Sequence, residues 1–366
     1  MPDVTPSRVA ATALPVVAVL SFAFGTGATL GFAGDTLGFD FLAYHQAAER
    51  LLAGEPLYDM SYTETGGFGL FYYPPTFAPL LLPFGLLRSE TAIVAWLLLS
   101  VIAFLVGVRA MPVSPTVRWL TVLFAGWSFP FVYAVKLGQV GPILFCLFAL
   151  GWRWLDQPIG LGTVSALGAA IKIQPGLMLV WALFTGRFRA VVAGGAVLVA
   201  LAVAATALAG LPAWSDFLTL LRTVSDPITT EHNFTPGAVA YQWGLPVGLA
   251  GIVQLVSTVA AAGLFLAAVR LTTDEVSYLV AVVVSQLVSP ILWDHYAMLL
   301  LLPVAYLLSA GRWWAAVIPV ATVWPLVGVV PPVVYPVVFW VTLVGLFVVG
   351  RAARDPRTSL GEALAA

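Results

Sequence analysis

The sequence has few charged residues, and this scarcity excludes most soluble folds. Only 9% of the 366 residues are Asp, Glu, Lys or Arg and 61% are hydrophobic, whereas soluble domains carry about 25% charged residues. So few polar side chains cannot coat soluble domains of this length. Lys and Arg (16) nearly balance Asp and Glu (17), which gives no reason to expect a nucleic-acid partner. The composition indicates an integral membrane protein.

Cysteine and the common catalytic signatures are also scarce. The single cysteine, Cys146, excludes an internal disulfide and lies in an apolar run, where packing is its expected role. No P-loop, G-x-S-x-G, H-E-x-x-H or C-x-x-C pattern occurs. The stretch Glu231, His232 and Asn233 is a weak metal pattern because the histidines of the chain lack helical spacing. We therefore predict no metal site.

Long apolar runs fill most of the chain instead. They lack the alternation, in segments of about ten residues, that marks outer-membrane barrels, so we predict helical spans. The chain is predicted to be a single all-α polytopic domain over residues 1–366, with about twelve transmembrane helices. Segment 75–87 is short and rich in proline, which favours a re-entrant helix. The predicted spans are residues 9–33, 91–108, 119–134, 139–152, 158–171, 176–186, 190–211, 246–269, 276–292, 297–310, 313–330 and 334–350.

Charges are distributed unequally between the two sides that this topology predicts. With both termini in the cytoplasm, eleven basic residues are cytoplasmic and five are external, whereas eleven of the seventeen acidic residues are external. This positive-inside pattern predicts a multi-pass protein of the plasma (inner) membrane, in contact with membrane lipids. The cytoplasmic set is Arg8, Arg109, Arg118, Arg153, Arg187, Arg189, Arg270, Arg312, Arg351, Arg354 and Arg357, and the external set is Arg50, Arg88, Lys136, Lys172 and Arg222.

Two long segments, residues 34–74 and 212–245, lie outside the predicted spans, and both are predicted on the outer side. In the first, residues 38–54 place apolar side chains at helical spacing, which predicts a short amphipathic helix on the membrane surface. Asp40 stands at its start, with Tyr44 one turn later on the same side. Burial near apolar surface destabilises an ionised carboxylate and makes it a better proton acceptor. Asp40 is therefore a candidate base, and a helix N-cap is the equal alternative.

Ionisable residues also interrupt apolar runs, where each is costly unless it faces a cavity, a partner or the interface. Lys136 and Lys172 fall at outer turns between short spans, and Asp294 with His295 lies between two later spans. Two ammonium groups and an Asp–His pair around an outward-opening cavity suit a substrate that carries phosphate. The alternatives are lysines that extend to the interface and a hydrogen-bonded interfacial histidine.

Several short blocks follow one another in a defined order from the first span to about residue 303. They are Asp40–Gly54 with Tyr58, Tyr73–Phe77, Gly138–Val140, Ile171–Pro175 followed by Arg187–Arg189, and Ser289–Tyr296. This order resembles glycosyltransferase family 87, the mannosyltransferase-like members of the GT-C superfamily. Two positions depart from the family's pattern. Gly141-Pro142 stands where Asn and an aliphatic residue are expected, and the loop around Asn233 lacks the family's Asn-Gln-Ser sequence.

The resemblance implies a GT-C-like helical bundle and a membrane enzyme. Such an enzyme transfers a hexose, with mannose favoured, from a polyprenyl-phosphate-linked donor to a lipid or polysaccharide acceptor at the outer face, with inversion. The resemblance assigns the catalytic carboxylate to Asp40, catalysis also to His295, and donor phosphate binding to Lys172. No cofactor is expected, because Lys or Arg alone can hold a monophosphate leaving group, although a divalent metal is compatible with the chemistry. We further expect Lys136 at the donor phosphate and Tyr44, Tyr73, Gln139 and Asp294 in substrate binding.

Two other activities would use the same features. One is arabinofuranosyl transfer from polyprenyl-phosphate arabinose, and the other is transport or flipping of a lipid-linked sugar. A transporter needs alternating access and commonly has paired halves, but no internal repeat is evident. A non-catalytic scaffold would leave Lys172 at membrane depth unexplained.

Overall fold

The computed structural model describes residues 8–61, 70–223 and 226–354. Within these ranges the regular structure is helical, apart from an isolated antiparallel bridge between Ser128 and Val323. The all-α prediction is therefore confirmed for the described residues.

Five of the described helices are long and apolar enough to cross a membrane, which supports a polytopic membrane protein. A sixth crossing results if α6 and α7, which meet at a bend of 118°, are counted as one broken span. The count of about twelve crossings stays a prediction. The five long helices are α1 (Arg8–Gly31), α4 (Ser89–Ala110), α10 (Phe188–Ala209), α13 (Val247–Leu271) and α17 (Val334–Arg354).

Shorter helices fill the space between the long ones. The α-helices are α2 (Phe39–Ala53), α3 (Ala78–Gly85), α5 (Pro115–Trp127), α6 (Phe129–Leu137), α7 (Gly141–Arg153), α8 (Pro158–Ile171), α9 (Leu177–Phe184), α11 (Pro212–Thr223), α12 (Pro236–Gln242), α14 (Asp274–Leu287), α15 (Leu301–Ser309) and α16 (Val317–Val320). The 3-10 turns are η1 (Gly34–Thr36), η2 (Pro75–Phe77), η3 (Gln174–Gly176), η4 (Asp294–Leu300), η5 (Trp313–Ala316) and η6 (Trp324–Leu326).

The long helices expose apolar surface, while a shorter helix forms the centre. Only 11% of the apolar window of α10 is buried inside the protein, and none of its valine and leucine side chains is buried. By contrast, every residue of α14 from Val276 to Leu287 is buried. An apolar exterior around a packed centre is expected when lipid, and not water, surrounds the molecule.

Two predicted spans differ from the structure at prolines and small polar residues. The predicted span 119–134 is interrupted at Ser128, where α5 ends and α6 begins one residue before Pro130. The predicted span 313–330 is a series of short pieces, η5, α16 and η6, because Pro319 and Pro325 interrupt the backbone hydrogen bonding.

The predicted outer segments contain more structure than expected. The amphipathic helix is present as α2, and segment 75–87 forms η2 and the eight-residue helix α3. The segment 212–245 was expected to be a loop, but it contains α11 and α12.

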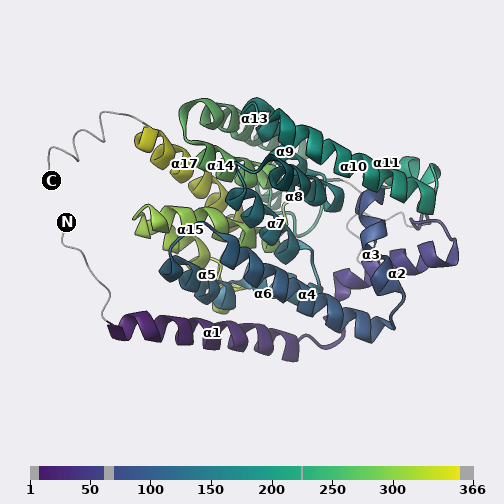
Figure 1. Cartoon of the computed structure of the whole chain (residues 1–366), viewed down its shortest axis with the longest axis horizontal. Helices are drawn as coiled ribbons and strands as arrows, with labels where there is room; N and C mark the ends of the chain where they lie inside the picture. The colour runs from purple at the N-terminus through teal and green to yellow at the C-terminus, as the bar shows by residue number, and fades with distance from the viewer. Residues whose placement is uncertain (1–7, 62–69, 224–225, 355–366) are drawn as a thin grey trace.

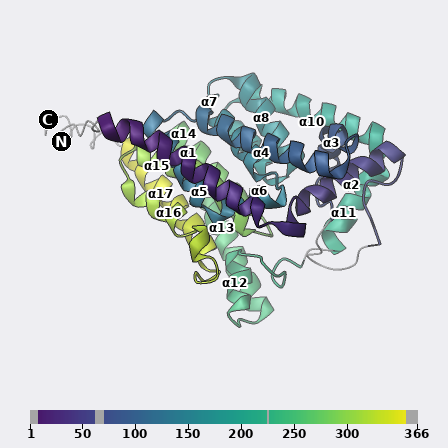
Figure 2. The same ribbon diagram turned by 90° about the horizontal axis from the view of Figure 1, so that it is seen from below.

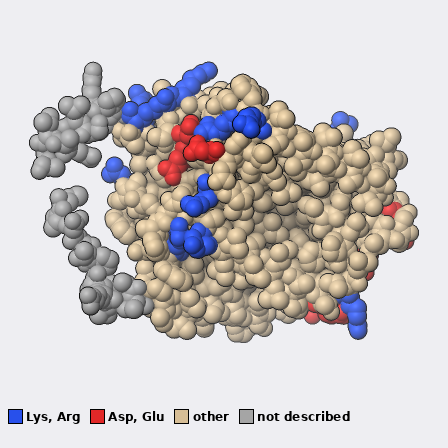
Figure 3. All heavy atoms as spheres, in the orientation of Figure 1, with Lys and Arg blue, Asp and Glu red and all other residues tan. Residues whose placement is uncertain are grey.

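The figures show how these elements are arranged. The start of α1 and the end of α17 lie at one end of the molecule, and α2, α3 and α11 lie at the other end (Figure 1). Figure 2 shows the same separation from a second direction, with α12 projecting from the side of the bundle. On the face drawn in Figure 3, charged side chains gather toward the ends and leave an uncharged band between them. This distribution suits a bundle whose middle is surrounded by hydrocarbon.

Candidate active site

Asp40 is the second residue of α2, and its side chain does not cap the helix. The N-cap is Gly38, which has a positive φ of 68° and donates its N–H to the carbonyl oxygen of Lys136 at 2.8 Å. The carboxylate of Asp40 instead accepts a hydrogen bond from Nε2 of Gln139. The N-cap alternative for Asp40 is therefore wrong, and the side chain is available to the site.

Gln139 is brought to α2 by the glycine that precedes it. Gly138 ends α6 with φ at 69°, and an added Cβ there would lie 2.7 Å from Cβ of Phe41. The indole of Trp96 also donates to the carbonyl oxygen of Gly138 at 2.7 Å. Only glycine permits this close approach together with this backbone conformation. The turn after α6 is thereby fixed against α2, and Gln139 faces Asp40.

Two tyrosines complete the surroundings of Gln139. Its Oε1 accepts hydrogen bonds from the hydroxyl groups of Tyr73 at 3.2 Å and Tyr44 at 3.4 Å. These two hydroxyl groups lie 2.5 Å apart, and Tyr58 donates to the carbonyl oxygen of Tyr73 at 2.7 Å. The predicted residues Tyr44, Tyr73 and Gln139 thus form one hydrogen-bonded group with Asp40.

Asp40 is held in a partly buried position among charges of both signs. Burial raises the pKa of its carboxyl group above the ordinary value of an aspartate, against the lowering effect of His295, the Gln139 hydrogen bond and Lys172. Asp294 adds a smaller raising effect. The structure therefore brings Asp40, Lys172, Asp294 and His295 within electrostatic reach of one another.

Lys172 lies in the turn between α8 and η3. Its Nζ donates to the hydroxyl group of Tyr296 at 2.7 Å and lies 4.4 Å from the centroid of that ring. The ammonium is also 5.3 Å from the ring centroid of Tyr73. Aromatic faces attract a cation but leave its N–H donors free for an anionic ligand. The turn is anchored because Thr76 donates to the carbonyl oxygen of Ala170 at 2.9 Å.

Asp294 and His295 open η4. One oxygen of Asp294, Oδ1, accepts from the backbone N–H of His295 at 2.6 Å and lies 3.4 Å from His295 Nδ1. The opposite ring atom, His295 Nε2, is buried and has no hydrogen-bond partner within the described residues. An unsatisfied buried ring nitrogen is costly unless a ligand completes it. This atom is therefore a candidate contact for substrate.

Lys136 lies beside this group and contributes to it chiefly through its backbone. Its carbonyl oxygen anchors Gly38, and its ammonium lies 5.5 Å from the ring centroid of Tyr133. The Tyr133 ring is 6.4 Å from that of His295. The expected contact between Lys136 and a donor phosphate stays a prediction.

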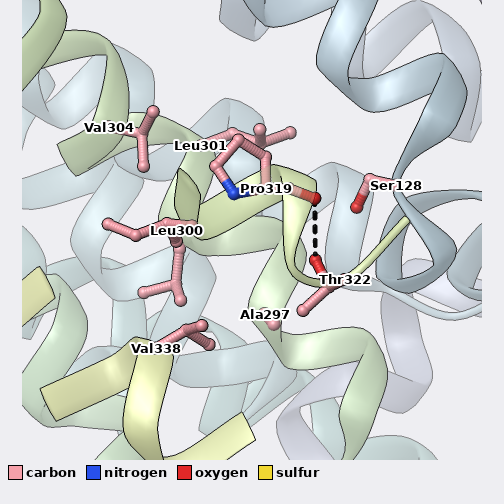
Figure 4. Close-up of a pocket in the computed structure, with 9 residues that line it drawn as sticks. Ser128, Ala297, Leu300, Leu301, Val304, Pro319, Thr322 and Val338 are labelled. Atoms are coloured by element: carbon pink, nitrogen blue, oxygen red, sulfur yellow. Dashed lines mark hydrogen bonds between the residues drawn. The ribbon is translucent and has the colours of Figure 1, made fainter. Parts of the chain in front are cut away.

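A cavity of about 340 Å³ borders Asp294. It lies between α6, the segment that contains His232 and Phe234, and residues 321–335. A second pocket, around Leu300, Pro319 and Thr322, has only about 10 Å³ of space, and its walls are mostly aliphatic (Figure 4). Its volume is that of about one water molecule, so it has no room for a substrate.

Several residues of the site were not predicted. Tyr296 holds Lys172 from within the Ser289–Tyr296 block, and Tyr133 lies next to both His295 and the cavity. The sequence does not indicate a site role for either tyrosine, because tyrosines are common near a membrane interface whatever the function. Within the described part of the chain, no group of three or more His, Cys, Asp or Glu side chains is placed to hold a metal ion.

Comparison with known proteins identifies the family of this chain. The model of glycosyltransferase family 87 matches residues 71–290, more than half of the 366 residues. The chain belongs to glycosyltransferase family 87. The family match includes Gln139 and Lys172, whereas Asp40 and His295 lie outside the matched residues. The fold therefore brings two residues from outside the matched region to the site: Asp40, which precedes it in the sequence, and His295, which follows it.

A curated relative has a more specific name than the family. It is a polyprenol-phosphate-mannose-dependent alpha-(1-2)-phosphatidylinositol mannoside mannosyltransferase of Mycobacterium tuberculosis. The two sequences are 30% identical over 201 residues, which are 48% of this chain and 46% of the relative. The match thus spans about half the length of the relative. No solved structure matches this family 87 chain.

Proposed function

We propose that this chain is a membrane glycosyltransferase that transfers a hexose, with mannose favoured, from a polyprenyl-phosphate-linked donor to a glycolipid or polysaccharide acceptor. The reaction takes place at the outer face and inverts the anomeric carbon. The family, and the mannose-dependent relative that resembles half of the chain, support the class of donor.

One observation carries the proposal. A carboxylate from α2 is held by Gln139 within electrostatic reach of Lys172 and His295, which come from two other parts of the chain. A base and a cation near each other are the two groups that inverting transfer from a phosphate requires.

In the proposed reaction the acceptor hydroxyl oxygen attacks the anomeric carbon of the donor. The bond from that carbon to the phosphate oxygen breaks, and its electron pair leaves with the polyprenyl phosphate. Asp40 takes the proton of the acceptor hydroxyl. Its raised pKa makes it a stronger base than a hydrated aspartate.

Lys172 stabilises the charge that develops on the departing phosphate. Its ammonium is oriented by the Tyr296 hydroxyl and the flanking rings, so little reorganisation is needed when the charge appears. His295 offers Nε2 to a substrate hydroxyl or phosphate oxygen, while Asp294 orients the opposite side of the ring.

The proposal is tested with purified protein, radiolabelled polyprenyl-phosphate mannose and a membrane lipid extract. We expect a new labelled lipid with the wild-type chain, and a loss of about 10²–10⁴-fold in the rate for Asp40→Asn, the range that general-base catalysis contributes. The matched control is Asp35→Asn, because Asp35 is exposed and precedes α2.

Three outcomes would contradict parts of the proposal. Full activity of Asp40→Asn removes this carboxylate from the mechanism. Transfer only from polyprenyl-phosphate arabinose changes the sugar and retains the chemistry. Movement of the lipid-linked sugar across vesicles, without a labelled product from any donor, identifies a transporter.

A further inference from the structure

The cavity that borders Asp294 is not lined by Lys172, and its walls are rich in aromatic side chains. Two aromatic pairs line it. The rings of Phe129 and Tyr133 stack at 4.9 Å with 15° between their planes, and those of Phe234 and Tyr335 lie 4.6 Å apart. Aromatic faces beside a carboxylate suit a ligand that has both C–H faces and hydroxyl groups.

The volume restricts what the cavity can hold. About 340 Å³ lies near the lower end of the roughly 300–1,000 Å³ that small-molecule pockets occupy. A single ring with its hydroxyl groups fits this space, whereas the acyl chains of a lipid do not. Asp294 supplies an acceptor, because within the described residues its hydrogen bonds to His295 use Oδ1 and leave Oδ2 for a ligand.

His232 is the second polar residue that lines the cavity, and its backbone is unusual. With φ at 57°, it is the one non-glycine residue among those described that has a positive φ. This conformation is disfavoured for side chains with a Cβ and persists where the surrounding structure enforces it. Such residues often occur at ligand sites.

The surrounding structure that enforces it is the network of Asn233. This fully buried side chain donates to the carbonyl oxygens of Pro227 and Pro290, the latter at 3.1 Å. Its Oδ1 accepts from the backbone N–H of Leu292 at 2.9 Å and of Thr235 at 3.0 Å. The segment with His232 is thereby fixed to residues 290–292, which lead directly into Asp294 and His295. Asn233 acts as a structural clamp, and the exposed His232 imidazole is left at the cavity.

Residues at the cavity interact electrostatically with the candidate base. Tyr133 lines the cavity and interacts electrostatically with both Asp294 and Asp40. His295 likewise contacts Asp294 and interacts with Asp40. A ring seated in the cavity would therefore place its hydroxyl groups beside Asp294, which is itself within electrostatic reach of Asp40.

We propose that this cavity binds a polyhydroxylated ring, the terminal sugar or cyclitol of the acceptor, and that His232 is a specificity-determining residue for that ring. This proposal rests on the proposed function. It places the acceptor ring between Asp294, His232 and the aromatic pairs, in a cavity that Lys172 does not line.

The test measures donor and acceptor kinetics separately. Purified full-length protein is assayed with polyprenyl-phosphate mannose and a phosphatidylinositol mannoside. His232→Gly removes the imidazole and permits the positive φ. We expect the KM for the acceptor to rise about tenfold, the effect of one lost hydrogen bond, with kcat and the donor KM within about twofold.

Two further variants separate recognition from folding. His232→Asn keeps a polar group and tolerates the left-handed backbone, so we expect less than a threefold rise in the acceptor KM. Val327→Trp introduces a larger side chain at another residue that lines the cavity, and it should raise the acceptor KM at least as much as His232→Gly.

The failures are distinguishable. Unchanged acceptor KM in both His232→Gly and Val327→Trp overturns the acceptor subsite and leaves the proposed function intact. A rise confined to the donor KM assigns the cavity to the polyprenyl chain and also overturns the inference. No product from the wild-type chain with any donor overturns the proposed function, and the inference with it.

Discussion

Gln139 offers the sharpest test of how Asp40 is controlled. Its Nε2 donates to the Asp40 carboxylate, and its Oε1 accepts from Tyr44 and Tyr73. Gln139→Leu keeps a side chain of similar size and removes the donor. The ionised form of Asp40 then loses a stabilising hydrogen bond, while burial continues to disfavour that form. The pKa of Asp40, already raised, should therefore rise further.

The expected displacement follows from the strength of such a bond. A hydrogen bond to a charged group contributes about 1.5–3 kcal/mol, and 1.36 kcal/mol corresponds to one pH unit. A base must be ionised to accept a proton, so activity falls as the pH drops through the pKa of that base. In Gln139→Leu we expect the acid limb of kcat/KM to move to higher pH by about one to two units.

The assay is the pH dependence of kcat/KM between about pH 5 and 9, with saturating donor and varied acceptor. Gln46→Leu is the matched control, because Gln46 is exposed on the same helix as Asp40. An acid limb that stays in place, or moves to lower pH, would refute the argument. A loss that is equal at every pH would assign Gln139 to substrate binding alone.

The other predictions concern the cation and the turn before Gln139. Lys172→Met should lower kcat by about 10²–10³-fold, because the departing phosphate loses its preorganised cation; less than a threefold loss in steady-state kinetics would exclude this role. Gly138→Ala and Gly186→Ala both place a Cβ at positive φ, which costs roughly 1–2 kcal/mol, but only at Gly138 does that Cβ meet a neighbour, Phe41, at 2.7 Å. The contact with Phe41 should destabilise Gly138→Ala by about 1–3 kcal/mol more than Gly186→Ala. Thermal unfolding should therefore show a larger fall in Tm for Gly138→Ala, and equal falls would contradict the close packing of this turn.

The long helices and α2 could be predicted from the sequence because their patterns are strong. Runs of about twenty apolar residues with polar ends leave little choice of structure. The helix α2 combines an apolar face with a terminal glycine, Gly54, in the left-handed conformation. The sequence also suggests the proximity of Asp40, Lys172 and His295, since each is an ionisable residue at the edge of an apolar run, and the three lie within electrostatic reach of one another.

Contacts between distant segments could not be predicted in the same way. Gln139 and Asp40 are 99 residues apart in sequence, and neither pattern identifies the other. In the sequence, Asn233 belongs to a weak metal-like pattern, yet its side chain clamps two loops together. The break at Ser128 and the irregular segment after α16 were obscured because short apolar runs fit helices, turns and spans equally well. These are the regions that form the cavity.

The contacts at the site also bear on the choice between transfer and transport. Lys172 is bonded to Tyr296, and Gln174 donates to the hydroxyl group of Ser289 at 3.0 Å, so polar contacts join the first half of the chain to the second. A transporter that rocks one half against the other would have to break these contacts in every cycle. A transferase benefits from them, because a base and a cation held in fixed positions reduce the cost of bringing two substrates together. The geometry therefore favours chemistry at a fixed site over alternating access.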